Sequence, residues 1–182
     1  MELHPHAQSL GTQLGRFNTR QLLYYSLTIV ERAMPFYLHF ARLEKIGDPD
    51  RIAAKIASAW DSYDLTESPN DIPIPIVPEK WNNSPYKPGY FAGQIIALFV
   101  DFLEQRDRVL VQQQADMMLA IAHYLSTVSG EDQFNDEIAQ QKNDLEKVRN
   151  LVEDDPTLLT DFITEALETA SRFAAINIPR LN

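Results

Sequence analysis

Apolar residues recur every three or four positions along most of the chain after residue 17, and this spacing predicts amphipathic helices. Asn18 and Gln21 fit a reciprocal capping box, so the first helix is expected to begin there. Pro35 lacks an N–H group and clashes with the preceding turn, which predicts that this helix ends near residue 34 and that a second segment follows over 36–46. Caps and apolar spacing predict further helices over 48–65, 90–105, 107–129, 134–152 and from 155 onward.

A proline-rich stretch separates the third and fourth of these predicted helices. Residues 66–89 hold more than half of the 11 prolines, and no helix is expected at that density. The stretch also carries Ile72, Ile74, Ile76 and Trp81, which have apolar surface to bury. We therefore expect an ordered strap that packs over the helices.

The pattern as a whole indicates an all-α protein. No alternation of apolar and polar residues outside the strap is long enough to predict a strand, and no internal repeat or linker divides the chain. The segment 90–105 is apolar around most of its circumference and is expected to be the central helix. The prediction is a single-domain bundle of six or seven helices over residues 18–182, after a loose amino-terminal lead-in over 1–17.

Composition narrows the classes of function. The 182 residues are 45% hydrophobic, which is enough for one sizeable core. The absence of cysteine excludes disulfides, thiolate metal sites and cysteine nucleophiles. Neither a secretory signal nor an apolar run of membrane-spanning length is present, so a cytoplasmic protein without membrane contact is the expectation.

The charge of the chain is strongly acidic and unevenly distributed. A net charge of −10 opposes binding to nucleic acid, which needs clustered Lys and Arg. Residues 131–168 hold 12 Asp and Glu against 3 Lys and Arg. Solvated helix faces are the simplest explanation of this imbalance, and an acidic surface for a basic protein partner is the functional one.

The familiar enzyme motifs are missing. The chain has no glycine-rich phosphate loop, no HExxH and no GxSxG, and its four histidines lack the Glu-x-x-His spacing of a di-iron bundle. We therefore predict no cofactor and no metal, and a non-enzymatic protein is favoured over an enzyme.

Charged residues within apolar surroundings mark a second candidate region. Glu31 and Arg32 lie just before Pro35, and Asp101 interrupts the predicted central helix. A bare charge is expensive to bury, so a structural ion pair or an exposed helix edge is the favoured explanation for each. The alternative is a ligand pocket, to which Trp60 and Asp61 would also contribute.

Some of these residues form a distinctive string. Glu31-Arg-Ala-Met-Pro-Phe-Tyr37, followed by Phe40, Gly47-Asp48 and Trp60-Asp61, resembles the amino-terminal half of the uncharacterised bacterial YjaG-like family, domain of unknown function 416. The likeness would span about residues 17–178. It departs from the family in the proline-rich strap and at Gly93, where a polar or acidic residue is expected. The resemblance implies an all-helical cytoplasmic fold without an established activity, with Glu31, Arg32, Tyr37, Trp60 and Asp61 among the shared residues.

Three hypotheses about function follow. The first is a non-enzymatic binding protein whose acidic carboxy-terminal helices engage a basic partner, and an immunity-type inhibitor of a toxin would be one form of it. The second is a small-molecule-binding or catalytic bundle with a pocket near Glu31, Arg32, Trp60 and Asp101. The third is a homodimer that uses exposed strap residues such as Trp81 and Tyr86.

Overall fold

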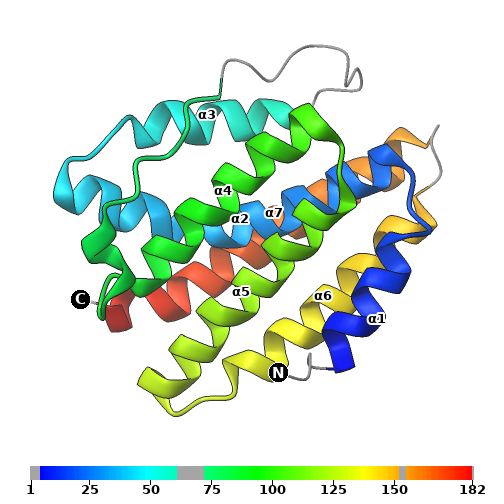
Figure 1. Cartoon of the computed structure of the whole chain (residues 1–182). Helices are drawn as coiled ribbons and strands as arrows, with labels where there is room; N and C mark the ends of the chain where they lie inside the picture. The colour runs from blue at the N-terminus through cyan, green and yellow to red at the C-terminus, as the bar shows by residue number, and fades with distance from the viewer. Residues whose placement is uncertain (1–4, 61–71, 152–154, 182) are drawn as a thin grey trace.

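A computed structural model describes residues 5–60, 72–151 and 155–181. Within these residues the chain forms α-helices and two short 3-10 helices, without a strand, which confirms the all-α bundle (Figure 1). The elements are α1 (Pro5–Leu14), α2 (Thr19–Glu44), α3 (Pro49–Ala59), η1 (Glu79–Asn82), α4 (Lys87–Gln105), α5 (Arg108–Ser129), α6 (Gln133–Asn150), α7 (Pro156–Asn177) and η2 (Ile178–Leu181). None of the helices in the described ranges has the combination of length and apolar character that crossing a membrane requires.

Residues 5–14 form a helix, whereas the sequence predicts a loose lead-in over residues 1–17. In α1, Leu10 and Leu14 are buried, and the helix packs against α5. These two leucines are four residues apart and therefore lie on one face of the helix. Gly11 and Gly15 suggest a loop, but burial of the leucine face outweighs the low helix propensity of glycine.

Helix α2 runs unbroken through Pro35, which corrects the prediction of two helices that meet there. Its first turn has the predicted capping box, in which Asn18 Oδ1 accepts from the backbone of Gln21 and the Gln21 side chain accepts from the backbone of Asn18. Pro35 costs one backbone hydrogen bond. Burial of residues along nearly the whole helix offsets that loss, since α2 packs against α3, α4, α5, α6 and α7.

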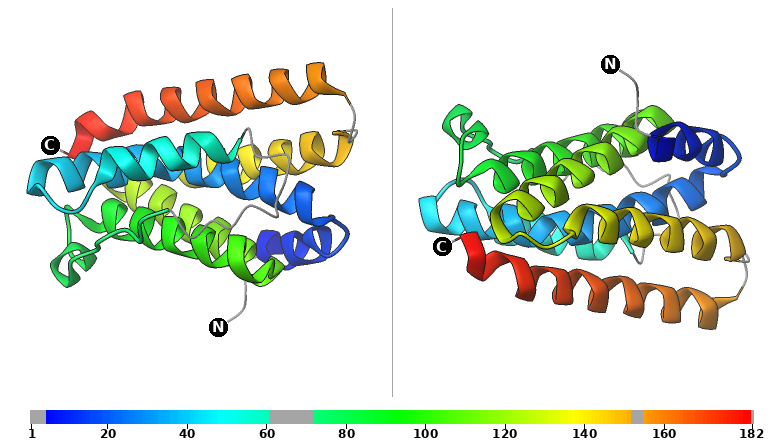
Figure 2. Two further views of the ribbon diagram at one scale, coloured as in Figure 1. Left: turned by 90° about the horizontal axis from the view of Figure 1, so that it is seen from above. Right: turned by 90° about the horizontal axis from the view of Figure 1, so that it is seen from below.

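Helix α2 is thus the axis of the bundle, and α4 lies along it. Helix α4 is largely buried, with side chains such as Ile95, Ile96, Phe99 and Phe102 in the core, but the central position predicted for it belongs to α2. Helix α4 packs against both α2 and α5. Helix α7 forms an outer layer on the opposite side of α2 from α4 and α5 (Figure 2).

The described part of the proline-rich strap, residues 72–86, runs to the start of α4 and contains η1. Trp81 is fully buried and stacks on Tyr86, with ring centroids 6.5 Å apart. A dimer contact through an exposed Trp81 is therefore wrong. Ile74 and Ile76, which were predicted to pack, are exposed.

A glycine on α4 allows the strap to approach closely. A Cβ atom added at Gly93 would stand 2.3 Å from Cγ2 of Val77 in the strap. Since no Cβ contact is that short, Gly93 leaves the space that Val77 fills. This explains why a glycine stands where the family resemblance leads us to expect a polar or acidic residue.

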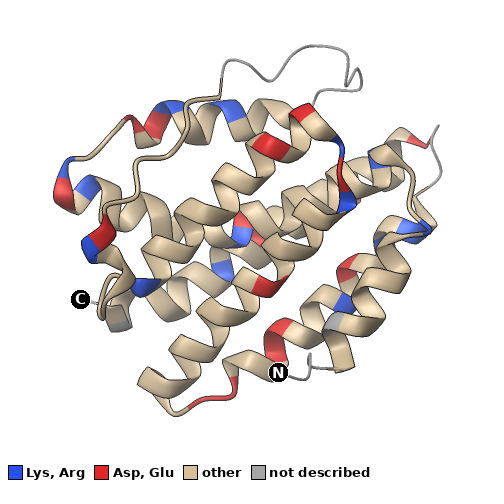
Figure 3. Cartoon of the chain, viewed as in Figure 1, with Lys and Arg blue, Asp and Glu red and all other residues tan. Residues whose placement is uncertain are grey.

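Helices α3 and α7 begin at the predicted aspartate caps, and α6 begins at an aspartate cap that was not predicted. Asp48, Asp132 and Asp155 each accept a backbone N–H from the first turn of the helix that follows. Helix α3 ends at Ala59, and the rest of the predicted 48–65 helix lies mostly outside the described residues. Charged residues are sparse along α4 and the middle of α5 and more frequent on α6 (Figure 3).

Candidate functional site

Two adjacent charged residues of α2 face different neighbours. Glu31 lines a groove beside α3 and α7, and Arg32 binds carboxylates of α6. Successive residues of an α-helix are about 100° apart around its axis, which places the two side chains on different flanks of α2. The sequence-predicted cluster is therefore divided between two sites.

The first site, which we call the Glu31 groove, lies between α3 and α7 with α2 as its floor. Its volume is about 410 Å³, within the range of small-molecule sites. Residues at helical spacing on all three helices form its lining, which is mostly apolar: Glu31, Met34, Pro35, Leu38, Ala53, Ile56, Ala57, Trp60, Ile163, Leu167, Ala170 and Ser171.

The carboxylate of Glu31 is the only ionisable group among these lining residues. Its side chain is partly buried, and Nε1 of Trp60 donates a hydrogen bond to Oε1 over 2.9 Å. Burial raises the pKa of Glu31, and the hydrogen bond from Trp60 partly offsets this effect. The groove therefore has one partly buried carboxylate on an apolar surface, and among the lining residues only Trp60 donates a hydrogen bond to it.

Pro35 removes the usual helical donor to the main-chain carbonyl of Glu31. In an α-helix the carbonyl of residue 31 points toward the N–H of residue 35, and proline has no N–H. The main-chain carbonyl of Glu31 therefore lacks its usual helical donor. Both Glu31 and Pro35 are among the lining residues of the groove.

Aromatic side chains pack around Trp60. Its ring stacks on Tyr24 with centroids 6.3 Å apart and meets the edge of Phe162 at 6.2 Å. Tyr24 belongs to α2 and Phe162 to α7, so the cluster ties together the three helices that bound the groove. Trp60 is 4% exposed, and this packing holds its indole N–H toward Glu31.

Arg32 occupies a closed ion-pair network on the other flank of α2. Its Nη2 and Nε donate to Oε1 and Oε2 of Glu137 over 2.9 and 3.2 Å, and its Nη1 donates to Oδ2 of Asp144 over 2.6 Å. All three side chains are buried. Burial alone would lower the pKa of Arg32, but the two carboxylates outweigh that effect and raise it. Arg32 stays charged and has a structural role.

Amide side chains extend this network to α1. Gln141 donates to Oε1 of Glu137 and to the carbonyl of Ala115, and its Oε1 lies 2.8 Å from Nε2 of His6. Gln140 donates to Oδ1 of Asp144. Each of the two carboxylates that bind Arg32 thus accepts a further hydrogen bond from a glutamine.

A second groove lies next to this network, between α6 and α7. Its volume is about 420 Å³, and the ion pair of Arg32 and Glu137 lies among its lining residues. The other charged and polar side chains of the lining are Gln133, Asp136, Gln140, Thr169 and Arg172. No group of three His, Asp or Glu that could hold a metal ion occurs in the described parts of the chain.

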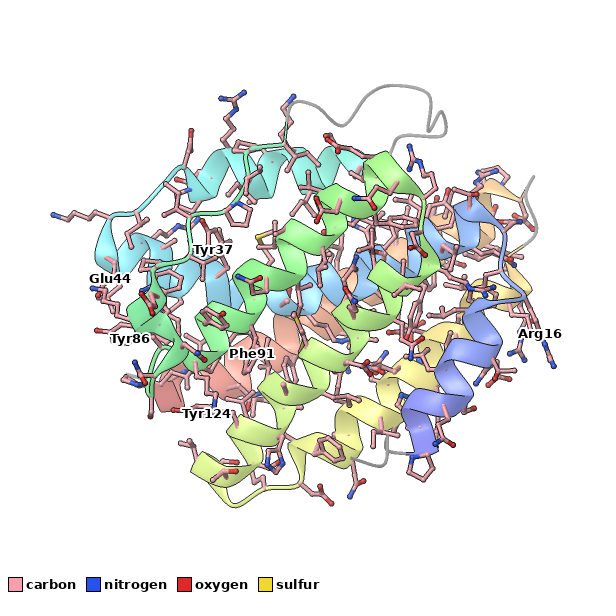
Figure 4. All side chains as sticks on the ribbon, in the orientation of Figure 1. Arg16, Tyr37, Glu44, Tyr86, Phe91 and Tyr124 are labelled. Carbon is pink, nitrogen blue, oxygen red and sulfur yellow. The ribbon has the colours of Figure 1, made fainter. Side chains whose placement is uncertain are left out.

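The other sequence-predicted site residues do not join either groove. Tyr37 is buried at the strap end of α2, where its ring meets the edge of Trp81 at 6.2 Å, near Tyr86 (Figure 4). Asp101 is exposed on α4 and, unlike Glu31 and Trp60, is not among the lining residues of the Glu31 groove. Asp61 lies outside the described residues.

Sequence reasoning missed the partners of Arg32. The acidic residues at the start of α6 were interpreted as dipole-complementing, yet Glu137 turns inward with Gln141 and Asp144. Their spacing of four and three residues, in register with Leu145 and Val148, places them on the apolar face of α6. The helical spacing of these polar residues relative to Leu145 and Val148 was therefore the sequence signal that could have identified them as buried.

No family model matches the chain, and no curated protein is similar to it. A solved structure is similar: the crystal structure of a DUF416 family protein from Shewanella baltica OS155. The superposition has a TM-score of 0.68 and 15% sequence identity, and it covers 92% of this chain and 95% of that chain. The resemblance to domain of unknown function 416 is thereby confirmed as a likeness of fold over nearly the whole chain.

Proposed function

We propose that this protein binds a small amphipathic organic ligand in the Glu31 groove and does not transform it. The observation that supports the proposal is the partly buried carboxylate of Glu31 in the wall of a groove whose other lining residues carry no charge. A large apolar groove with one well-placed polar group is the usual form of a small-molecule site.

Binding fits the groove better than catalysis does. General acid–base chemistry or nucleophilic attack needs a second reactive group within hydrogen-bond distance of the first. Among the lining residues, Glu31 has no ionisable neighbour, and Trp60 supplies an indole N–H that only donates. The groove can orient a molecule, but it offers no pair of groups to move a proton.

The test uses the neutral apolar dye N-phenyl-1-naphthylamine, whose fluorescence rises on transfer out of water. We expect Ala57→Phe, which puts a ring into the groove from α3, to weaken dye binding about tenfold, equal to removal of roughly 50 Å² of apolar contact. Ala54→Phe is the matched control, because Ala54 is also exposed on α3 but does not line the groove. Equal binding by the two variants, or no dye binding to the unmodified protein, would reject the groove as the site.

A second candidate function is recognition of a basic protein partner by the acidic carboxy-terminal helices. Asp136 and Glu146 on α6 and Asp161 and Glu168 on α7 are exposed and support it. Other acids of this region are already used, since Glu137 and Asp144 bind Arg32 and Glu165 pairs with Lys147.

Poly-L-lysine is a suitable probe for this second candidate. The double variant Asp161→Lys/Glu168→Lys should weaken binding, whereas the reversal Asp50→Lys/Glu104→Lys on α3 and α4 should weaken it less. Equal losses would show that net charge alone attracts the probe and would reject a dedicated acidic face. A role as an immunity-type inhibitor of a toxin would depend on this acidic face of α6 and α7.

A further inference from the structure

We propose that the ligand of the Glu31 groove carries a protonated primary amine, which binds the Glu31 carboxylate while an apolar chain fills the groove. This inference rests on the proposed function, because it identifies the chemical class of the ligand for the same site. Three features of the groove support it.

The first feature is an excess of acceptors over donors. Trp60 donates to Oε1 of Glu31, and Oε2 accepts no hydrogen bond from the described residues. The main-chain carbonyl of Glu31 has lost its helical donor because residue 35 is proline. A primary ammonium group has three N–H donors and no acceptor, so it matches this set better than a hydroxyl or an amide.

The second feature is charge. The ammonium would bring the positive charge that the partly buried carboxylate lacks, and a charge-assisted hydrogen bond is about twice as strong as a neutral one. The protein carries a net charge of −10, which attracts cations in general. No Lys or Arg lines the groove, so no cation of the chain competes at the described lining positions.

The third feature is the apolar wall on both sides of Glu31. Met34 and Leu38 continue the α2 floor beyond Glu31, with Ile56 on α3 and Leu167 on α7. Leu167 is 41% exposed, which leaves apolar surface for an alkyl or aryl group to cover. The ligand is therefore an amphipathic amine with its head at Glu31.

The test compares three probes of one chain length: n-octylamine, 1-octanol and octanoate. Binding is followed by calorimetry and by the indole N–H resonances of the two tryptophans. Trp60 lines the groove and Trp81 is buried within the strap, outside the lining, so the Trp60 resonance should move on binding and the Trp81 resonance should stay in place. We expect octylamine to bind at least about tenfold more tightly than octanol, and octanoate more weakly than both.

Variants assign that preference to Glu31. Glu31→Gln should bring the affinity for octylamine down to that for octanol and leave the octanol affinity unchanged. Asp101→Asn is the matched control, because it removes an exposed carboxylate outside the groove, and it should keep the preference. Octyltrimethylammonium, which is a cation without N–H donors, should bind more weakly than octylamine.

The pH dependence gives an independent readout. Burial raises the pKa of Glu31, so the affinity for octylamine should increase with pH as Glu31 loses its proton, over a range above that of an ordinary glutamate. The other lining residues of α2, α3 and α7 do not titrate, and Lys55 and Glu168 lie on α3 and α7 outside the lining. Octanol binding should not follow this profile.

The outcomes separate the two proposals. Equal affinities for octylamine and octanol that are both reduced by Ala57→Phe would overturn the amine inference and leave the groove as a ligand site. Equal affinities for octylamine and octyltrimethylammonium would also overturn it. Absence of any binding that perturbs Trp60 would overturn the proposed function itself.

Discussion

Glu31 and Arg32 are neighbours on one turn of α2, yet they have opposite surroundings. Arg32 is 2% exposed and meets two carboxylates, which in turn accept from Gln140 and Gln141. Glu31 is partly buried against apolar residues and has the indole N–H of Trp60 as its hydrogen-bond donor. A charge whose partners are complete belongs to the fold, whereas a charge with unfilled acceptor positions is the better candidate for ligand binding.

The two grooves beside α7 also differ in the charged residues that line them. They are similar in volume, about 410 and 420 Å³. The groove toward α6 is lined by the bonded ion pair of Arg32 and Glu137 and by the exposed charged residues Asp136 and Arg172, and the groove toward α3 has a single acid on an apolar wall. The two grooves therefore differ in the charges of their lining and not in their volume: the groove toward α3 has one acid, and the groove toward α6 has charged residues of both signs.

The largest expected effect follows from removal of the cation on the Arg32 side. Arg32→Met should lower the free energy of unfolding by about 3–5 kcal/mol, because Glu137 and Asp144 would remain buried without a positive partner. Urea denaturation at pH 7 measures it.

The control is the triple variant Arg32→Met/Glu137→Gln/Asp144→Asn, which removes the stranded charges as well. It should recover a large part of the loss. A loss below about 1 kcal/mol for Arg32→Met alone would contradict the structural role given to this residue, since exposed ion pairs contribute no more than that.

A smaller effect is expected where the network reaches α1. His6→Ala removes the hydrogen bond to Gln141 and should cost about 1 kcal/mol. Hydrogen exchange of the α1 amides should accelerate more than that of α4, because the lost contact holds α1. Uniform acceleration in all helices would show that His6 has no local role in docking α1.

The effect on the Glu31 side should have the opposite sign. Burial raises the pKa of Glu31, so the folded state binds this proton more tightly than the unfolded chain, and the native protein loses stability as pH rises through the folded pKa. Glu31→Gln keeps an acceptor for Trp60 and removes that loss. We expect a gain of roughly 0.5 kcal/mol at pH 7, found by denaturant titration.

This gain should shrink as pH falls, because wild-type Glu31 becomes protonated and resembles glutamine. Denaturation at pH 4 should therefore show little difference between the two proteins. A destabilised Glu31→Gln protein at pH 7 would mean that the carboxylate serves the fold and not a ligand.

The smallest effect is expected at Asp101. Asp101→Asn changes an exposed residue of α4 and should alter the free energy of unfolding by no more than about 0.5 kcal/mol. A larger change would show that the interruption of the apolar pattern at this position has a structural cause.

Local chemistry made most of the fold predictable. The caps at Asn18, Asp48 and Asp155 depend on side chains two or three residues from the groups that they bind, and the structure has all of them. The burial of α4 along most of its length follows from its apolar circumference. The prediction that the helix breaks at Pro35 was wrong because the sequence shows only the local loss of one backbone hydrogen bond. The burial of α2 that offsets this loss depends on residues far away in the chain.

The candidate site was less accessible to sequence reasoning. Glu31 and Trp60 were proposed together, and the structure joins them, since the helices that carry them are consecutive. Arg32 meets Glu137 across a separation of 105 residues, and no local pattern reports such a pair. Asp101 was grouped with Glu31 because both interrupt apolar runs, but an interruption does not tell which way a side chain points.

The adjacency of Glu31 and Arg32 also makes the register of α2 a condition of folding. One alanine inserted between Gln21 and Leu27 would rotate the part of the helix that precedes the insertion by about 100° relative to the part that follows it. Either the tertiary contacts of the turn before the insertion, such as the hydrogen bond from Gln21 to the carbonyl of Val148, or the seat of Arg32 between Glu137 and Asp144 would then be lost. Helix α2 is therefore expected to tolerate substitutions on its surface but to reject length changes between its cap and its charged turn.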